Sequence, residues 1–85
     1  MRILICEDSV LLREGLVRLL EHSSHDVSAA LPDTTELFST LENDMPDLAI
    51  LDVRLPPTYS DEGIRAAIKI RERYPELPLL VLSQY

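Results

Sequence analysis

The sequence predicts an α/β domain in which helices cover both faces of a parallel sheet. Four short apolar runs alternate along the chain with three segments whose apolar residues have helical spacing. Strands that alternate with helices form parallel sheets with right-handed crossovers. Continuously apolar runs are typical of strands that are buried on both faces of such a sheet. The predicted fold class is therefore α/β, with a doubly wound parallel sheet.

The composition limits the chain to one small globular domain. Its 85 residues are 46% hydrophobic and 27% charged, which is typical of a soluble chain with a core. The net charge of −7 disfavours contact of this segment with nucleic acid, because phosphate binding needs clustered Lys and Arg. An acidic composition also serves solubility alone. No apolar run approaches the length of a membrane span, so we expect no membrane partner.

The first strand is expected over residues 3–6, and a helix follows it. Cys6, the single cysteine, cannot form an intrachain disulfide, so a reducing, cytoplasmic location is expected. We interpret its side chain as part of the core rather than as a reactive thiol. Asp8 or Ser9 can cap the helix. The spacing predicts an apolar stripe made of Leu12, Leu16, Leu19 and Leu20.

The second strand and the second helix have weaker signals. Residues 27–30 are expected to form a strand mainly because they lie between two helices. Asp33 and Glu36 have the spacing of a capping box, which predicts that a helix opens there and ends near Asn43. The apolar side of this helix is predicted to hold Leu37, Phe38 and Leu41.

The second half of the chain repeats the alternation. The third strand is expected over residues 48–52, before Pro56 and Pro57 force the backbone out of regular structure. A third helix is expected over residues 61–74 and a fourth strand over residues 79–82. One side of the third helix is predicted to carry Ile64, Ala67, Ile68 and Arg71.

Polar residues stand at the carboxyl ends of three predicted strands. Glu7 and Asp8 follow the first strand, Asp52 ends the third, and Ser83 follows the fourth. These ends share one edge of a parallel sheet, where ligands bind at the point of reversed strand order. Each residue also has a local explanation: Glu7 and Asp8 as helix-start carboxylates, Asp52 as a turn residue, and Ser83 as an ordinary loop hydroxyl. Their common placement favours a site.

Converging carboxylates predict a cation at this edge. Without one, their charges repel and raise one another's pKa. Oxygen ligands suit Mg²⁺ or Mn²⁺, and the backbone carbonyl of Arg54 is expected to be a further ligand. A metal beside a carboxylate nucleophile, Asp52, supplies the parts of a phosphoryl-transfer site. The Ser83 hydroxyl is then expected to bond a phosphoryl oxygen.

Three segments carry a family resemblance: residues 4–9 (LICEDS), 52–57 (DVRLPP) and 81–85 (VLSQY). They resemble the response-regulator receivers of two-component signalling, most closely those of NarL/LuxR-type transcriptional regulators. The resemblance implies a flavodoxin-like (CheY-like) fold with strand order 2-1-3-4. It implies that the protein is not an enzyme but a phosphoacceptor that controls dimerisation and transcription.

The resemblance also implies a role for each site residue. Asp52 takes a phosphoryl group from a sensor histidine kinase, and Ser83 bonds this group and moves in the switch. Mg²⁺ is held by Glu7, Asp8, Asp52 and the carbonyl of Arg54.

The chain stops before the fourth helix, fifth strand and fifth helix of the family, and before its phosphate-binding lysine. We therefore expect residues 1–85 to be the N-terminal part of a receiver domain. The rest of the receiver and a helix-turn-helix domain, through which alone DNA is bound, are expected in the full-length protein. The apolar run at residues 80–82 would then be exposed, which predicts self-association or strand swapping. The loop over residues 56–63 is longer than is common in the family, and its glycine comes later.

Two other functions are distinguishable from the sequence. A phosphatase of the haloacid-dehalogenase type needs a second Asp two residues after its nucleophile, where this chain has Arg54. The alternative is a receiver-like dimerisation or interaction module that is never phosphorylated. The presence of Glu7, Asp8, Asp52 and Ser83 disfavours that alternative.

Overall fold

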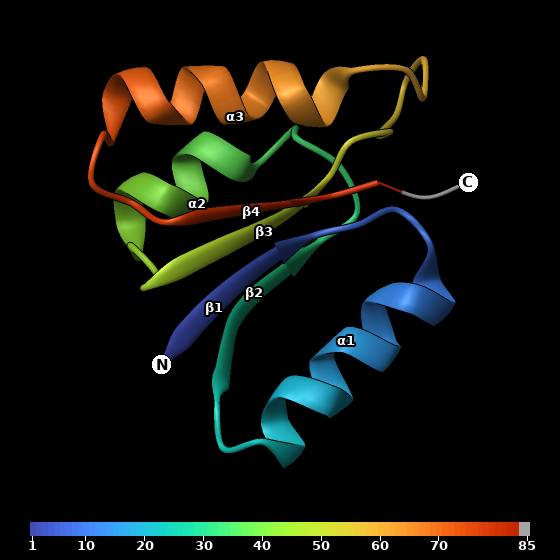
Figure 1. Cartoon of the computed structure of the whole chain (residues 1–85), viewed down its shortest axis with the longest axis vertical. Helices are drawn as coiled ribbons and strands as arrows, with labels where there is room; N and C mark the ends of the chain where they lie inside the picture. The colour runs from blue at the N-terminus through green and yellow to red at the C-terminus, as the bar shows by residue number, and fades with distance from the viewer. Residues whose placement is uncertain (84–85) are drawn as a thin grey trace.

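The computed structural model describes residues 1–83 and has one parallel sheet with three helices (Figure 1). The strand order is β2-β1-β3-β4, which confirms the predicted fold class and order. The strands are β1 (Arg2–Cys6), β2 (Asp26–Leu31), β3 (Leu48–Asp52) and β4 (Leu79–Leu82). The helices are α1 (Val10–His22), α2 (Leu37–Asn43) and α3 (Glu62–Arg73). Gln84 and Tyr85, which end the segment at 81–85, lie outside the described residues.

The helices cover the two faces of the sheet unequally. In Figure 1, α1 lies on one side of the sheet, and α2 and α3 lie on the other. The larger core lies on the α2 and α3 side and includes Leu4, Leu51 and Ile70, all fully buried. Ile3, Ile5 and Ile50 form the smaller core on the α1 side. This separation follows from the strands, whose successive side chains point to opposite faces. No helix among the described residues is long and apolar enough to cross a membrane.

Helix α1 forms as predicted but buries a narrower stripe. The Ser9 hydroxyl accepts a hydrogen bond from the Leu12 backbone N–H at 3.3 Å, so Ser9 is the cap. Leu16 and Leu20 pack against the smaller core. The prediction was wrong for Leu19, which is 61% exposed. Successive residues of a helix point about 100° apart, so Leu19 points to the side of α1 when Leu20 faces the sheet. No other described helix covers α1 (Figure 1).

Helix α2 begins later than the capping box predicted. Leu37 is its first residue, and the cap residue Glu36 makes no side-chain capping bond. Asp33 instead accepts a hydrogen bond from the Thr35 backbone N–H at 2.9 Å, which closes a turn before the helix. Aspartate competes in this way because its short side chain reaches the backbone two residues on. The predicted apolar side is confirmed: Leu37 and Leu41 are buried and Phe38 packs against the core.

Helix α3 packs mainly through a different face from the predicted side, of which Ala67 packs against the larger core. Its buried residues are Gly63, Ala66 and Ile70, whereas Ile64 and Ile68 are 45% and 54% exposed. The cause is the close approach of α3 to β3. The Gly63 backbone N–H donates to the carbonyl oxygen of Val53 at 2.9 Å, and a Cβ at Gly63 would lie 1.7 Å from the carbonyl oxygen of Asp52. No side chain fits at the position of Gly63.

Candidate metal and phosphoacceptor site

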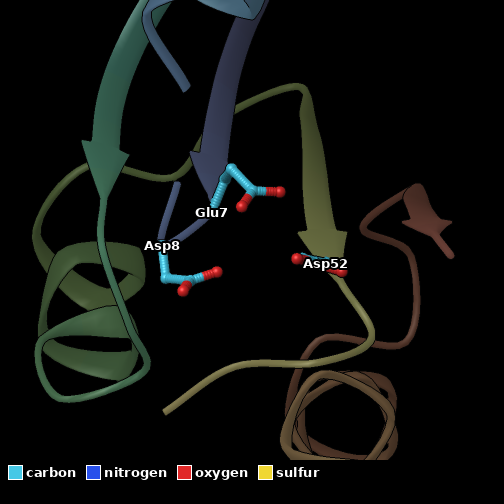
Figure 2. Close-up of side chains that lie close together, drawn as sticks. All are labelled: Glu7, Asp8 and Asp52. Atoms are coloured by element: carbon cyan, nitrogen blue, oxygen red, sulfur yellow. The ribbon is translucent and has the colours of Figure 1, made fainter. Parts of the chain in front are cut away.

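Three carboxylates converge at the carboxyl edge of the sheet (Figure 2). Glu7 and Asp8 follow β1 directly, and Asp52 is the last residue of β3. Because β1 and β3 are parallel neighbours with Cys6 opposite Leu51, the next residues, Glu7 and Asp52, emerge together. One carboxylate oxygen of each residue lies within 4.8 Å of the others. The convergence predicted from the sequence is therefore present.

Two of these carboxylates are almost completely removed from solvent. Glu7 is 1% exposed and Asp52 is 5% exposed, while Asp8 is half-buried. Burial raises the pKa of Glu7 to about 7, and repulsion from Asp52 adds to the shift. A hydrogen bond from the Ser9 backbone N–H to Glu7 Oε2, 2.9 Å long, acts in the opposite direction. The site thus favours either a proton or a cation.

The donor set fits a hard divalent cation. Mg²⁺ prefers carboxylate oxygens, and it is bound through one or two of them with water filling other positions. The thiol of Cys6 belongs to the core, as predicted: it is fully buried and donates to the carbonyl oxygen of Asp33 at 3.1 Å. Burial raises the pKa of Cys6 to about 12, so at neutral pH it is not a thiolate ligand.

The other two predicted site residues lie at the same edge. The Arg54 backbone N–H donates to Asp52 Oδ1 at 3.2 Å, which places the turn after β3 against the carboxylate. Ser83 follows Leu82, which pairs with Asp52 in the sheet, and it is exposed. The role of the Arg54 carbonyl as a ligand and that of the Ser83 hydroxyl remain predictions.

The long loop before α3 is held by a carboxylate that was not singled out in the sequence. Glu62 accepts hydrogen bonds from the backbone N–H groups of Thr58, at 2.8 Å, and Ser60, at 3.1 Å. It also accepts one from the Thr58 hydroxyl, and these bonds lower the pKa of Glu62 to about 2. Tyr59 lies between the two residues with a φ of 57°. These bonds therefore fix a turn immediately before α3.

Arg13 is the second site residue that sequence reasoning missed. Its Nη1 donates to the carbonyl oxygen of Glu7 at 2.8 Å and lies 3.4 Å from that of Asp8. The available signal was positional: Arg13 lies one helical turn after the cap Ser9, from where a long side chain reaches back to the preceding loop.

The strand order places the chain in the class of flavodoxin-like, doubly wound α/β domains, which bind ligands at the carboxyl ends of their strands, where Glu7 and Asp52 lie buried. The chain belongs to the response regulator receiver domain family of two-component systems, whose model matches residues 3–85. The identification rests on the whole chain rather than on the site alone.

Relatives with curated descriptions include transcriptional and oxygen regulators. The oxygen regulatory protein NreC of Staphylococcus epidermidis is 31% identical over 86 residues, which cover 100% of this chain and 38% of NreC. The virulence transcriptional regulatory protein PhoP of Salmonella typhimurium is 39% identical over 83 residues, which cover 98% of this chain and 35% of PhoP. The chain thus spans less than two fifths of the length of these relatives.

Solved structures support the same fold. The response regulator TrrA of Thermotoga maritima, in complex with Mg(2+)-BeF, has a TM-score of 0.85 and 27% identity, covering 99% of this chain and 70% of that one. A LuxR-family response regulator of Aurantimonas sp. has a TM-score of 0.86 and 28% identity, covering 99% of this chain and 59% of that one.

Proposed function

We propose that Asp52 accepts a phosphoryl group from a sensor histidine kinase, in a site that holds Mg²⁺ or Mn²⁺ through Glu7, Asp8 and Asp52. The observation that carries the proposal is the convergence of these carboxylates within 4.8 Å, with Glu7 and Asp52 buried. The relative TrrA was solved with Mg(2+)-BeF, which is consistent with this donor set.

The transfer is a substitution at phosphorus. A carboxylate oxygen of Asp52 forms a new P–O bond while the P–N bond to the kinase histidine breaks, and the imidazole leaves with the electron pair. A bound divalent cation supplies positive charge that offsets the charge of the transferring group. The Arg54 backbone N–H, 3.2 Å from Asp52 Oδ1, orients the nucleophile. The Arg54 carbonyl completes the ligand set, and the Ser83 hydroxyl bonds the phosphoryl group and moves in the switch.

The function of the whole protein is proposed from its relatives. NreC and PhoP are named as regulatory proteins, and this chain matches 38% and 35% of their lengths. We infer that residues 1–85 are the N-terminal part of a receiver whose C-terminal part and helix-turn-helix domain lie further along the polypeptide. Phosphorylation then controls dimerisation and DNA binding in the cytoplasm, and the receiver is a phosphoacceptor rather than an enzyme.

Phosphorylation from acetyl phosphate with Mg²⁺ tests this function in the full-length protein. We expect intact-mass spectrometry to detect one added phosphoryl group and peptide mapping after borohydride reduction to place it on Asp52. Asp52→Asn should abolish the modification. Asp26→Asn, an exposed aspartate at the start of β2 on the opposite edge of the sheet, should retain it. An unmodified wild-type protein would instead support the non-phosphorylated interaction module. Modification that survives in Asp52→Asn would overturn Asp52 as the phosphoacceptor.

A further inference from the structure

We propose that Arg13 is a positioning residue that holds the segment Glu7–Ser9 in the conformation that binds the cation. The inference rests on the proposed function, because it concerns the metal site of the phosphoacceptor. The key contact is between one guanidinium nitrogen, Nη1 of Arg13, and the backbone carbonyl oxygens of both Glu7 and Asp8, at 2.8 and 3.4 Å.

The backbone of this segment is anchored on both sides of the carboxylates. The Glu7 N–H donates to the carbonyl oxygen of Leu31 at 2.9 Å, which fixes the segment to the end of β2. The Arg13 N–H donates to the carbonyl oxygen of Ser9 at 2.8 Å and begins the hydrogen bonding of α1. Between these anchors the carbonyls of Glu7 and Asp8 point to Arg13, so that the arginine joins the first turns of α1 to the segment that carries two of the three acids.

This contact acts on the cation through geometry. The carboxylate oxygens of Glu7, Asp8 and Asp52 lie within 4.8 Å of one another, and like charges this close repel when all three groups are ionised. An unanchored segment would relax by moving Glu7 or Asp8 away from Asp52. A charged donor bonded to two consecutive carbonyls resists that movement, and charge-assisted hydrogen bonds are stronger than neutral ones. Groups that orient metal ligands in this way typically change metal affinity by about 10-fold or more when removed. Arg13 is half-buried and both contacts are partly buried, which reduces competition from water.

The test measures Mg²⁺ affinity directly, by titrating the full-length protein with MgCl₂ and following amide resonances by NMR. We expect Arg13→Gln to raise the Mg²⁺ dissociation constant about 10-fold. Arg18→Gln removes an exposed arginine from the same helix and should leave the constant within about twofold of wild type. The free energy of unfolding without Mg²⁺ is measured in parallel, so that a loss of stability is not mistaken for a loss of affinity.

Different results would overturn the role of Arg13 and the proposed function of the site. If wild type binds no Mg²⁺, the proposed function fails. If wild type binds and folded Arg13→Gln binds equally well, the role of Arg13 is overturned. Should Arg13→Gln not fold, Arg13→Lys is measured instead, because it keeps a charged donor but loses the planar guanidinium. An increase of about threefold in its dissociation constant would support the inference, and a constant equal to that of wild type would overturn it.

Discussion

Glu7 makes the free energy of unfolding of this protein depend on pH. It is 1% exposed beside the Asp52 carboxylate, and its pKa is raised from 4.5 to about 7 by burial and by that neighbour. In the unfolded chain, where these causes are absent, the carboxyl keeps its usual pKa. Between pH 4.5 and pH 7 the folded protein therefore binds more protons at Glu7 than the unfolded chain does. The free energy of unfolding accordingly falls as the pH rises through this window.

Substitution of Glu7 by Gln removes the loss of stability that ionisation of the buried Glu7 carboxyl causes. In EDTA at pH 8, we expect Glu7→Gln to be more stable than wild type by up to about 3 kcal/mol, because one pKa unit corresponds to about 1.4 kcal/mol. At pH 4 the two proteins should be nearly equal, because Glu7 is then largely protonated in both states. Urea unfolding at a series of pH values measures the difference.

Two controls bear on this prediction. Glu14→Gln replaces an exposed carboxylate on α1 and should not reproduce the pH-dependent gain. Added Mg²⁺ should stabilise wild type more than Glu7→Gln, because the variant lacks one charged ligand. A difference between Glu7→Gln and wild type that stays constant from pH 4 to pH 8 would contradict the assigned electrostatics.

Helix α3 determines how the turn after β3 is placed, and it does so through Gly63. The Gly63 N–H bonds the Val53 carbonyl at 2.9 Å, within one residue of the phosphoacceptor candidate Asp52. The space beside the Gly63 α-carbon is filled by backbone, since the Asp52 carbonyl oxygen would be 1.7 Å from an added Cβ. Backbone atoms cannot move aside as a flexible side chain can, so the helix or the strand end has to shift.

A pair of Gly→Ala substitutions separates this steric effect from helix propensity. Gly63→Ala should lower the free energy of unfolding by about 2 kcal/mol or more, as overpacking does. Gly15→Ala, in the middle of α1 with no atom within 4 Å of the added Cβ, should raise it by about 0.5 to 1 kcal/mol. Urea denaturation of both variants gives the comparison. A neutral or stabilising effect of Gly63→Ala would show that α3 does not pack against β3 this closely.

The same helix shows where sequence reasoning succeeds and where it stops. Strands β1, β3 and β4 were predictable because their apolar runs are continuous, whereas β2 was predictable mainly from its place between two helices. The convergence of Glu7, Asp8 and Asp52 followed from parallel topology together with neighbouring positions of β1 and β3. The buried face of α3 was not predictable from hydrophobicity, because Ile64 and Ile68 are more apolar than Gly63 and Ala66 yet lie outside. Close approach of backbones selects small residues, and the sequence pattern does not encode that distance.

Ambiguous polar signals account for the other differences. The sequence around Asp33 fits both a capping box and a turn. In the structure Asp33 accepts a hydrogen bond from the Thr35 N–H and so forms the turn. Arg13 was missed because it binds backbone carbonyls, which every residue has, so no residue pattern marks its partner. Glu62 was missed because its partners are mainly N–H groups of a loop whose conformation is not fixed by its composition. Sequence reasoning thus located the candidate ligating side chains but not the contacts that hold them.

At the scale of the whole molecule, apolar side chains are exposed at one edge of the described sheet. β4 is an edge strand in the described sheet, and Leu80 and Val81 are 48% and 39% exposed. Ile64 and Ile68 of α3, the helix that packs beside β4, are exposed as well. An edge strand with exposed apolar side chains offers unpaired backbone groups and hydrophobic area to another chain. This surface is where residues 1–85 would associate with a second copy.

Association through the edge of β4 is measurable in solution. Sedimentation velocity of the segment 1–85 over a tenfold concentration range should show a self-associating species, and Leu80→Lys with Val81→Lys should weaken the association at least about 10-fold, because edge lysines oppose strand pairing. Leu11→Lys is the matched control: Leu11 is 85% exposed on α1, far along the chain from β4, and its replacement should leave the association unchanged. If the double variant associates as strongly as wild type while Leu11→Lys does not, the contact runs through α1. The exposed edge of β4 would then be sufficiently protected by its own twist and short length of four residues.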